Sequence, residues 1–332
     1  MIILIVKDSP ENRDRLSGNS KTKNKQMNVI VGATGQVGLF LINDLKSKGL
    51  DVRAVVRNPE KLSDKTIETR TADLFKVEEL KKAFEGGTNV FVLTPENPAS
   101  HDIIDDTKRI VANYKEAIQA TGIKRVIALS CVGAHIDSNT GNVLMSRILE
   151  QSLDDLEIEK VFVRPSYYYS NWLGYVETME QYGVLPTFFP GDLEIEMNSP
   201  VDLAEFLARV MVDTSSEKKR IYELTGQKYS SLDVAAAFSK LLNKKISLQP
   251  ITKDKWVETL VSVGFTENSA DNLSDMTQAV IDNKTVPEYP EHAVKLPTTL
   301  NTYFRRAIET IACFLQINWR NGVDNDGGTI RF

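Results

Sequence analysis

Three glycines near the start of the chain have a spacing that is typical of phosphate-binding turns. They form the pattern G-x-x-G-x-x-G within the run Gly32, Ala33, Thr34, Gly35, Gln36, Val37 and Gly38. An apolar, strand-like segment (Asn28–Val31) precedes the turn and a segment with helical periodicity follows it. The first glycine permits the tight turn, the second lets the backbone approach a pyrophosphate, and the third lets the helix pack closely on the strand. The helix N-terminus offers unpaired N–H groups to the phosphates, so the run predicts a dinucleotide-binding turn.

A basic residue after the next predicted strand indicates which dinucleotide binds there. The strand Val52–Val56 is followed by Arg57, with Lys61 shortly after it. An acidic residue at this place would bind the ribose 2′-hydroxyl of NAD, whereas an arginine accommodates the 2′-phosphate of NADP. Because the nearby acid, Asp51, lies at the other end of the strand, Arg57 and Lys61 predict an NADP(H) site. The alternative is a solvated surface arginine.

Composition and charge restrict the function classes. With 332 residues the chain can bury a sizeable core, as one large domain or two smaller ones. The net charge of −5, without a Lys/Arg-rich face, argues against direct nucleic-acid binding. The apolar stretch Met1–Val6 is too short for a signal sequence or a membrane span, so we expect no membrane attachment. The sequence specifies no oligomeric state.

The cysteines and histidines form neither a disulfide framework nor a metal-binding pattern. Cys131 and Cys313 lie far apart, which is typical of a protein from a reducing compartment. The three histidines have no metal-ligand spacing, alone or with the cysteines. We therefore predict a cytoplasmic protein without a metal site.

Strand-like and helix-like segments alternate from Met27 onward, which favours a parallel sheet with helices on both faces. We predict an α/β fold: a Rossmann-type doubly wound parallel sheet with a small, mostly helical C-terminal substrate domain. The expected divisions are a disordered N-terminal extension (1–26), an NADP-binding Rossmann domain (27–170), a substrate-cleft subdomain whose strands can join the same sheet (171–310) and a C-terminal tail (311–332).

Two regions of the second half of the chain differ from the first half in their residue composition and periodicity. Aromatic residues, prolines and glycines cluster through Tyr167–Gly191, which predicts loops over a binding cleft. Residues 253–310 are predicted to be mostly helical. The cleft therefore lies, in this prediction, between the sheet and a helical C-terminal part.

Several short motifs occur in the order that is typical of one protein family. They are Val-Gly-Ala-Thr-Gly-Gln-Val-Gly, Val-Val-Arg57-Asn58-Pro59, Ala72-Asp73-Leu74, Leu93-Thr94-Pro95, Leu129-Ser130-Cys131-Val132-Gly133-Ala134 and Val163-Arg164-Pro165-Ser166-Tyr167. The series resembles the NmrA-like branch of the atypical short-chain dehydrogenases/reductases, over roughly residues 27–305. That branch includes NADPH-dependent quinone reductases and non-catalytic NADP-sensing regulators.

The resemblance implies a role for each matching position in holding NADP(H). The glycine run would bind the pyrophosphate and Arg57 the adenosine 2′-phosphate. The other implied contacts are Asp73 and Leu74 beside the adenine, Thr94 and Pro95 along the ribose next to the nicotinamide, Ser130 beside the nicotinamide and Tyr167 at its carboxamide side. Two alternatives stay open: Asp73 as a helix cap and Leu74 as a core residue.

The catalytic Tyr-x-x-x-Lys pair of the superfamily is missing from this chain. Val143 stands at the tyrosine position and Arg147 at the lysine position. Valine cannot transfer a proton, and arginine stays protonated and is a poor acid or base. Arg147 remains a candidate for binding the nicotinamide ribose or an anion, with a plain surface arginine as the alternative. Alcohol–ketone chemistry by the usual route is therefore disfavoured, and so is a sugar epimerase or dehydratase.

Candidate proton donors follow the fifth and sixth predicted strands. His135 comes after the fifth strand, and Tyr168 follows the sixth at the same sheet edge, near Tyr169 and Asn171. Each residue type is also common in loops and packing. Cys131 is either a reactive thiol or a small buried apolar residue.

Two functions from different classes are compatible with these residues. The first is an NADPH-dependent reductase that passes hydride to a quinone or similar conjugated carbonyl, since the phenolate formed is a stable anion that takes a proton from solvent. The second is a non-catalytic NADP(H)-sensing regulator that acts through a protein partner. The missing pair is compatible with both, while the aromatic segment favours an enclosed site for a small-molecule acceptor.

Overall fold

The computed structural model describes residues 26–213, 215 and 217–320, with the backbone only for residues 311–320. The predicted disordered extension 1–26 lies outside the described residues except for Gln26, and so does the part of the predicted tail from residue 321 onward. In the described part of the chain, no helix is both long and apolar enough to cross a membrane.

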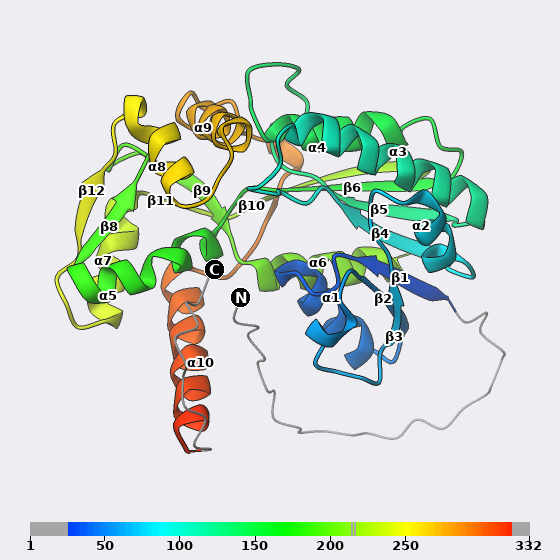
Figure 1. The fold of residues 1–332 in the computed structure, drawn as a ribbon, viewed down its shortest axis with the longest axis horizontal. Helices are drawn as coiled ribbons and strands as arrows, with labels where there is room; N and C mark the ends of the chain where they lie inside the picture. Colours follow the sequence, from blue (N-terminus) through cyan, green and yellow to red (C-terminus); the bar gives the residue numbers. More distant parts are fainter. Residues whose placement is uncertain (1–25, 214, 216, 321–332) are drawn as a thin grey trace.

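Eight parallel strands form the main sheet (Figure 1), which confirms the predicted Rossmann-type doubly wound fold. The order is β13-β10-β6-β5-β4-β1-β2-β3. The strands are β1 (Met27–Val31), β2 (Asp51–Val56), β3 (Glu68–Thr71), β4 (Asn89–Leu93), β5 (Arg125–Leu129), β6 (Glu159–Pro165), β10 (Lys219–Thr225) and β13 (Val294–Lys295). β2 and β3 lie on one side of β1, whereas β4 and the later strands lie on the other side, so the strand order reverses between β1 and β4. Doubly wound sheets bind ligands outside the carboxyl ends of the strands at such a point.

Helices cover both faces of the main sheet (Figure 1). One face carries α2 (Val77–Phe84), α3 (Ile103–Thr121) and α4 (Val143–Leu153), and the other carries α1 (Gln36–Ser47) and α6 (Pro200–Val212). Successive side chains of a strand point to opposite faces. The apolar strands therefore contribute side chains to two separate cores, one under each helix layer. The glycine turn and the strand ends are therefore held on a rigid, doubly covered sheet.

Local sequence signals set the limits of the long helix α3. The Asp102 side chain accepts a hydrogen bond from Asp105 N at 2.9 Å and caps the helix start. Gly122, with a φ of 71°, ends it in the left-handed conformation. Both signals lie directly next to the helix, so its limits depend on the local sequence alone.

A small lobe with its own apolar core lies beside the carboxyl ends of the main-sheet strands (Figure 1). It contains two small sheets, in the orders β11-β9-β7 and β12-β8. Its elements are β7 (Tyr167–Tyr168), η2 (Tyr169–Tyr175), α5 (Val176–Tyr182), β8 (Val184–Thr187), β9 (Ile195–Asn198), β11 (Gln227–Tyr229), α7 (Ser231–Leu241), β12 (Ser247–Pro250), η3 (Lys253–Lys255), α8 (Trp256–Ser262), α9 (Glu267–Ile281) and α10 (Leu300–Arg320). Two further short helices, η1 (Pro59–Lys61) and η4 (Pro290–His292), precede the main-sheet strands β3 and β13 in the chain.

The structure corrects the prediction of loops through Tyr167–Gly191. This segment contains β7, η2, α5 and β8. β7 pairs with β9 and β8 pairs with β12, so the partners lie far along the chain and leave no local periodicity. The mostly helical region 253–310 also contains β13, which pairs with β10 at the sheet edge, and α10 continues past residue 310.

Candidate functional site

The glycine turn has the geometry that its spacing predicts. Gly32 has a φ of 69°, a conformation that favours glycine, and Gly35 N donates a hydrogen bond to Gly32 O over 2.9 Å. A Cβ atom added to Gly38 would lie 2.3 Å from Gly32 O. The start of α1 therefore packs on the turn more closely than any other residue type would allow.

The N-terminus of α1 is open to an anion. Gly35 is its N-cap, and within the described chain no side chain caps the helix and no acidic residue occupies its first turn. Thr34, Gly35 and Gln36 line the cavity described below, whereas the side chains of Ala33 and Val37 belong to the core. The free N–H groups and the helix dipole favour a negative group at this point. The turn thus fits the pyrophosphate of a dinucleotide.

The basic and acidic residues predicted to hold the adenosine end lie along the same sheet edge. Arg57 follows the end of β2, and Lys61 ends η1; both are exposed, and among the described residues no partner bonds either side chain. Asp73 Oδ1 accepts a hydrogen bond from Phe75 N at 3.0 Å, and Leu74 is half-buried against the core. Arg57 and Lys61 are therefore free to bind an anion, while Asp73 and Leu74 already have structural roles.

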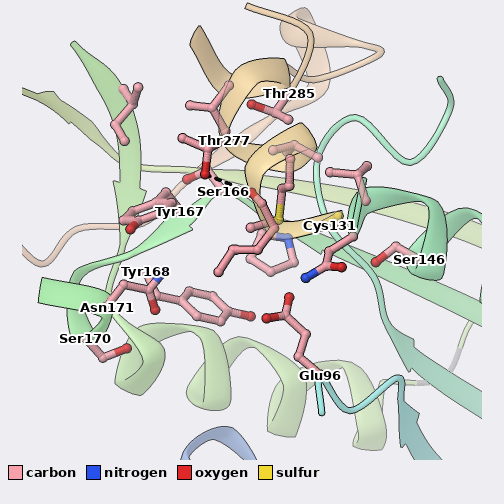
Figure 2. A pocket seen from close by; sticks show the side chains of 18 of the residues that line it. Glu96, Cys131, Ser146, Ser166, Tyr167, Tyr168, Ser170, Asn171, Thr277 and Thr285 are labelled. Carbon is pink, nitrogen blue, oxygen red and sulfur yellow. Dashed lines mark hydrogen bonds between the residues drawn. The ribbon is translucent and has the colours of Figure 1, made fainter. Parts of the chain in front are cut away.

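A cavity of about 950 Å³ separates the carboxyl ends of the main-sheet strands from the small lobe (Figure 2). Its lining begins at the glycine turn, continues along the segments that follow β4, β5 and β6, and includes the start of α4, the small lobe and α9. The sequence-predicted residues in this lining are Thr34, Gly35, Gln36, Thr94, Pro95, Ser130, Tyr167 and Tyr168.

The hydroxyl groups of Ser130, Tyr167 and Tyr168 are not available to act as bases. Ser130 Oγ donates a hydrogen bond to Glu150 Oε1 and is buried. Burial raises the pKa of both Tyr167 and Tyr168 above the ordinary tyrosine value, and it raises the pKa of Cys131 to about 12. Because a thiolate is the reactive form of cysteine, the raised pKa makes Cys131 an unreactive thiol, although the residue is partly exposed to the cavity.

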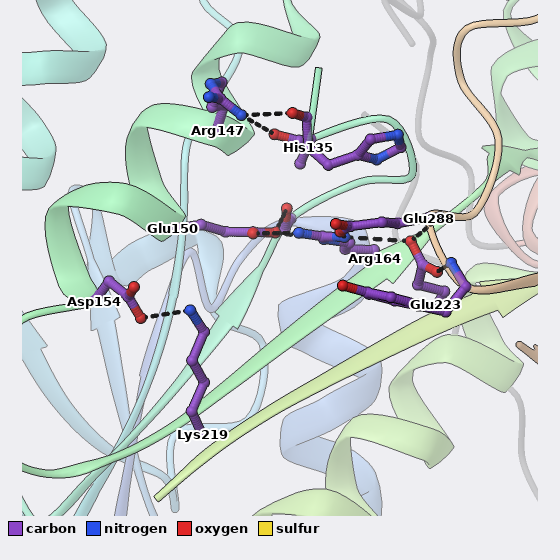
Figure 3. Close-up of polar contacts among 11 residues, drawn as sticks. His135, Arg147, Glu150, Asp154, Arg164, Lys219, Glu223 and Glu288 are labelled. Carbon is purple, nitrogen blue, oxygen red and sulfur yellow. Dashed lines mark hydrogen bonds and ion pairs between the residues drawn. The ribbon is translucent and has the colours of Figure 1, made fainter. Parts of the chain in front are cut away.

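His135 and Arg147 do not line the cavity, contrary to the sequence-based expectation. Arg147 Nη1 donates hydrogen bonds to His135 O at 2.6 Å and Ala134 O at 3.4 Å. These bonds hold the loop after β5, and the His135 ring lies on the side of Arg164 and Glu288 (Figure 3). The guanidinium is committed to the backbone, so neither residue is positioned to contact a ligand in the cavity.

Glu96 is a cavity residue that the sequence analysis does not single out. It follows Thr94 and Pro95 after β4, and its accessible surface faces the cavity. Although Glu96 is exposed to the cavity, desolvation by the protein around it raises the pKa of its carboxyl, and a hydrogen bond with Asn142 acts in the opposite direction. Its position at the carboxyl end of a buried strand is the signal that could have identified it.

Three aromatic rings form one side of the cavity, which we call the aromatic wall: Tyr167, Trp172 and Phe189. The ring centroids of Tyr167 lie 6.0 Å from Trp172 and 5.7 Å from Phe189, and those of Trp172 and Phe189 are 6.2 Å apart. Such contacts hold aromatic rings in fixed tilted or edge-to-face orientations. Trp172 and Phe189 are buried in the core of the small lobe, so the half-buried ring of Tyr167 is the part of the wall that is most open to a ligand.

A buried charge network connects the main sheet with the segment that closes the cavity (Figure 3). Arg164 on β6 bonds to Glu150 and Glu288 at 2.7 Å each and to Glu223 at 3.3 Å. Glu223 on β10 also accepts hydrogen bonds from the backbone N–H groups of Glu288 and Tyr289 at 2.8 Å each. The residues directly before Glu288 line the cavity, so the network holds that part of the lining in place.

The chain is similar in sequence to two reductases. It is 25% identical over 258 residues to an NAD(P)H azoreductase from Xenophilus azovorans, a match that covers 75% of this chain and 86% of the relative. It is 28% identical over 256 residues to quinone oxidoreductase 2 from Escherichia coli, with the same coverage of 75% and 86%.

Two solved structures illustrate the range of proteins with this fold. An NADPH-dependent quinone oxidoreductase from Escherichia coli, complexed with NADPH, superposes with a TM-score of 0.66 at 26% identity, over 87% of this chain and 100% of the other. The negative transcriptional regulator NmrA superposes with a TM-score of 0.68 at 20% identity, over 91% and 99%; at that identity the likeness concerns the fold alone. The NmrA-like family matches residues 24–304, and the chain therefore belongs to the NmrA-like family.

Proposed function

We propose that the protein is an NADPH-dependent reductase that transfers hydride to a quinone or a similar conjugated carbonyl. The observation that carries this proposal is the continuous cavity, which joins the glycine turn to the aromatic wall. The names of the two reductase relatives support an NAD(P)H-dependent oxidoreductase. We also propose a cytoplasmic location, because the two cysteines are widely spaced.

The glycine turn and Arg57 are the parts of the chain that fit the cofactor best. We assign the pyrophosphate to the backbone of the glycine turn and the start of α1, and the adenosine 2′-phosphate to Arg57 with Lys61. The remaining proposed contacts are Asp73 and Leu74 at the adenine, and Thr94, Pro95, Ser130 and Tyr167 toward the nicotinamide. When bound, NADPH supplies a hydride from the C4 position of its nicotinamide. The role of the chain is to hold that group against the acceptor and to exclude water around it.

The residues around the proposed acceptor bind and orient it. Val143 lines the cavity at the position of the missing catalytic tyrosine, and it has no proton to transfer. A quinone tolerates this loss, because its reduction forms a phenolate that takes a proton from solvent. The aromatic wall suits a planar acceptor, and Tyr168 is the sequence-predicted proton donor that also lines the cavity.

The alternative function is a non-catalytic sensor that binds NADP(H) and acts through a protein partner. An apolar side chain where the superfamily has its catalytic tyrosine favours this alternative. The two functions differ in turnover, because both require the cofactor site and only the reductase requires an acceptor in the cavity.

Purified protein, NADPH and a panel of quinones distinguish the two functions. NADPH oxidation is followed by absorbance, and NADPH binding is measured by fluorescence titration in the absence of acceptor. We expect oxidation above the protein-free rate with at least one quinone. Tight NADPH binding without oxidation across the whole panel would reject the reductase and favour the sensor.

A further inference from the structure

The segments that follow three neighbouring strands bring side chains together at Glu96. Glu96 follows β4, Cys131 follows β5, and Tyr168 follows β6. All three residues line the cavity, and Figure 2 shows the Tyr168 hydroxyl and the Glu96 carboxyl directed toward one another. The cavity therefore contains a carboxyl group at the sheet edge where the strand order reverses, the edge that also carries the glycine turn.

The surroundings of Glu96 favour the neutral carboxylic acid. Glu96 is exposed to the cavity that it lines. Desolvation by the surrounding protein is nevertheless the larger influence on the pKa of Glu96 and raises it, whereas the hydrogen bond with Asn142 lowers it. The titratable groups that respond to Glu96 electrostatically are Cys131, Tyr167 and Tyr168, and none of these three is a cation. With no positive partner among these neighbours, Glu96 keeps its proton to a higher pH than an ordinary glutamic acid.

Two other carboxyl groups line the cavity, but their surroundings differ. Glu194 precedes β9 and Glu196 belongs to it, so both come from the small lobe. Burial raises the pKa of Glu196, but the ammonium groups of Lys228 and Lys295 oppose that effect. Glu96 is thus the cavity carboxyl that combines a place at the main-sheet edge with surroundings free of such cations.

We propose that Glu96 donates the proton that accompanies hydride transfer, and that the acceptors of this site include α,β-unsaturated carbonyl compounds. This inference rests on the proposed reductase function. The hydride forms a C–H bond at the β-carbon, the π electrons shift to the carbonyl oxygen, and the Glu96 O–H bond breaks as that oxygen takes the proton. The acceptor gains two electrons, the nicotinamide loses them, and the Glu96 carboxylate regains a proton from water.

Reduction of an unsaturated carbonyl depends more on a proton donor from the protein than reduction of a quinone does. Its reduction passes through an enolate, which is a stronger base than the phenolate formed from a quinone. General acid catalysis contributes about 10²- to 10⁴-fold to such steps. A donor at Glu96 therefore supplies, from a different strand end, the function that Val143 cannot perform.

The variant Glu96→Gln tests the donor role, because glutamine has nearly the same size and forms hydrogen bonds but has no acidic proton. We expect it to lower kcat by about 10²-fold or more with cinnamaldehyde, and much less with 1,4-naphthoquinone. The wild-type rate with cinnamaldehyde should fall as pH rises through the pKa of Glu96, and the variant should lack that decline. Glu180→Gln, on the exposed face of α5 and outside the cavity lining, is the matched control and should leave both rates unchanged.

Infrared spectroscopy of the protein without cofactor gives a second, independent readout. In a pH titration the wild type should show a protonated-carboxyl C=O band that persists to a higher pH than that of an ordinary glutamic acid, and this band should be absent from Glu96→Gln and present in Glu180→Gln. If quinone turnover is intact but the band is missing and cinnamaldehyde reduction is unaffected by Glu96→Gln, the donor role is wrong and the reductase proposal stands. If the band is present but no acceptor of either class is reduced, the reductase proposal fails and the donor role fails with it. Reduction of the quinone but not of cinnamaldehyde by the wild type contradicts the proposed acceptor class.

Discussion

The two arginines that the sequence offers as ligands, Arg57 and Arg147, have the same charged group in different surroundings. Arg57 is exposed at the end of β2 and has no bonding partner among the described residues. Arg147 donates to two loop carbonyls and lies outside the cavity lining. A guanidinium binds a phosphate through donors that nothing else occupies, so the structure favours Arg57 as the anion ligand.

Replacing Arg57 by aspartate should reverse the cofactor preference. Arg57→Asp removes the proposed charge-assisted contact with the 2′-phosphate, which would contribute about 1.5–3 kcal/mol, and adds repulsion. We expect NADPH affinity to fall by about 10- to 100-fold, with a much smaller change for NADH, in fluorescence titrations of both. Lys218→Asp makes the same charge change at an exposed position next to the amino end of β10 and should alter neither affinity. Equal losses for both cofactors would show that Arg57 does not contact the 2′-phosphate.

At the scale of elements, the approach of α1 to the turn after β1 shapes the proposed cofactor site. The helix start, the turn and the strand end depend on one another, because Gly38 packs directly on the Gly32 carbonyl. A side chain at Gly38 would push the helix away and move the N–H groups that point toward the anion. The proposed phosphate binding would therefore depend on helix packing at this contact.

The variant Gly38→Ala tests that coupling. Its Cβ would lie 2.3 Å from Gly32 O, so the turn must shift, and we expect a stability loss of about 1–3 kcal/mol together with weaker NADPH binding. Urea unfolding measures the first effect and fluorescence titration the second. Ser47→Ala, at the exposed far end of α1, should change neither by a comparable amount. Unchanged NADPH affinity in folded Gly38→Ala would contradict the proposed role of the turn.

At the scale of the whole molecule, one buried arginine joins the two cores and the cavity lining. Arg164 reaches carboxylates from α4, β10 and the segment after α9. Although burial acts to raise it, the Arg164 guanidinium lowers the pKa of Glu288 below 4.5. A carboxyl with a lowered pKa stabilises the fold above its unfolded-state pKa and loses that contribution as pH falls.

Arg164→Met should destabilise the protein and change its response to acid. The buried carboxylates of Glu150 and Glu223 and the partly exposed one of Glu288 lose their cation, and we expect a loss of about 3–5 kcal/mol at neutral pH. In the wild type, the ionised Glu288 carboxyl should contribute less to the free energy of unfolding as pH falls below about 4.5. In the variant this contribution is smaller at neutral pH, so the difference in unfolding free energy between the two proteins should decrease in acid. Urea unfolding of both proteins at neutral pH and at a pH below about 4.5 measures the loss of stability and its change in acid.

Lys219→Met is the control for this variant. It removes an exposed 2.6 Å ion pair with Asp154 from a neighbouring strand, a pair that should contribute less than about 1 kcal/mol. A similar loss in Lys219→Met and Arg164→Met would contradict the special role of the buried network.

By itself the sequence determined the parts of this protein that depend on neighbouring residues. Glycine spacing predicts the turn at Gly32, a cap and a glycine set the limits of α3, and apolar runs predict the strands of the Rossmann-type sheet. Each signal is confined to one element, and parallel strands joined by helices then have few ways to assemble. The resemblance to the NmrA-like family rests on the same local motifs.

Only the tertiary structure decided which side chains share the cavity. His135 and Glu96 both follow a buried strand of the same sheet, but His135, whose backbone carbonyl accepts a hydrogen bond from Arg147, lies outside the lining, whereas Glu96 faces Tyr168 inside it. The strands β7 and β8 likewise form because of partners that are distant in sequence. Such outcomes depend on contacts between residues far apart in the chain, and no local pattern encodes them.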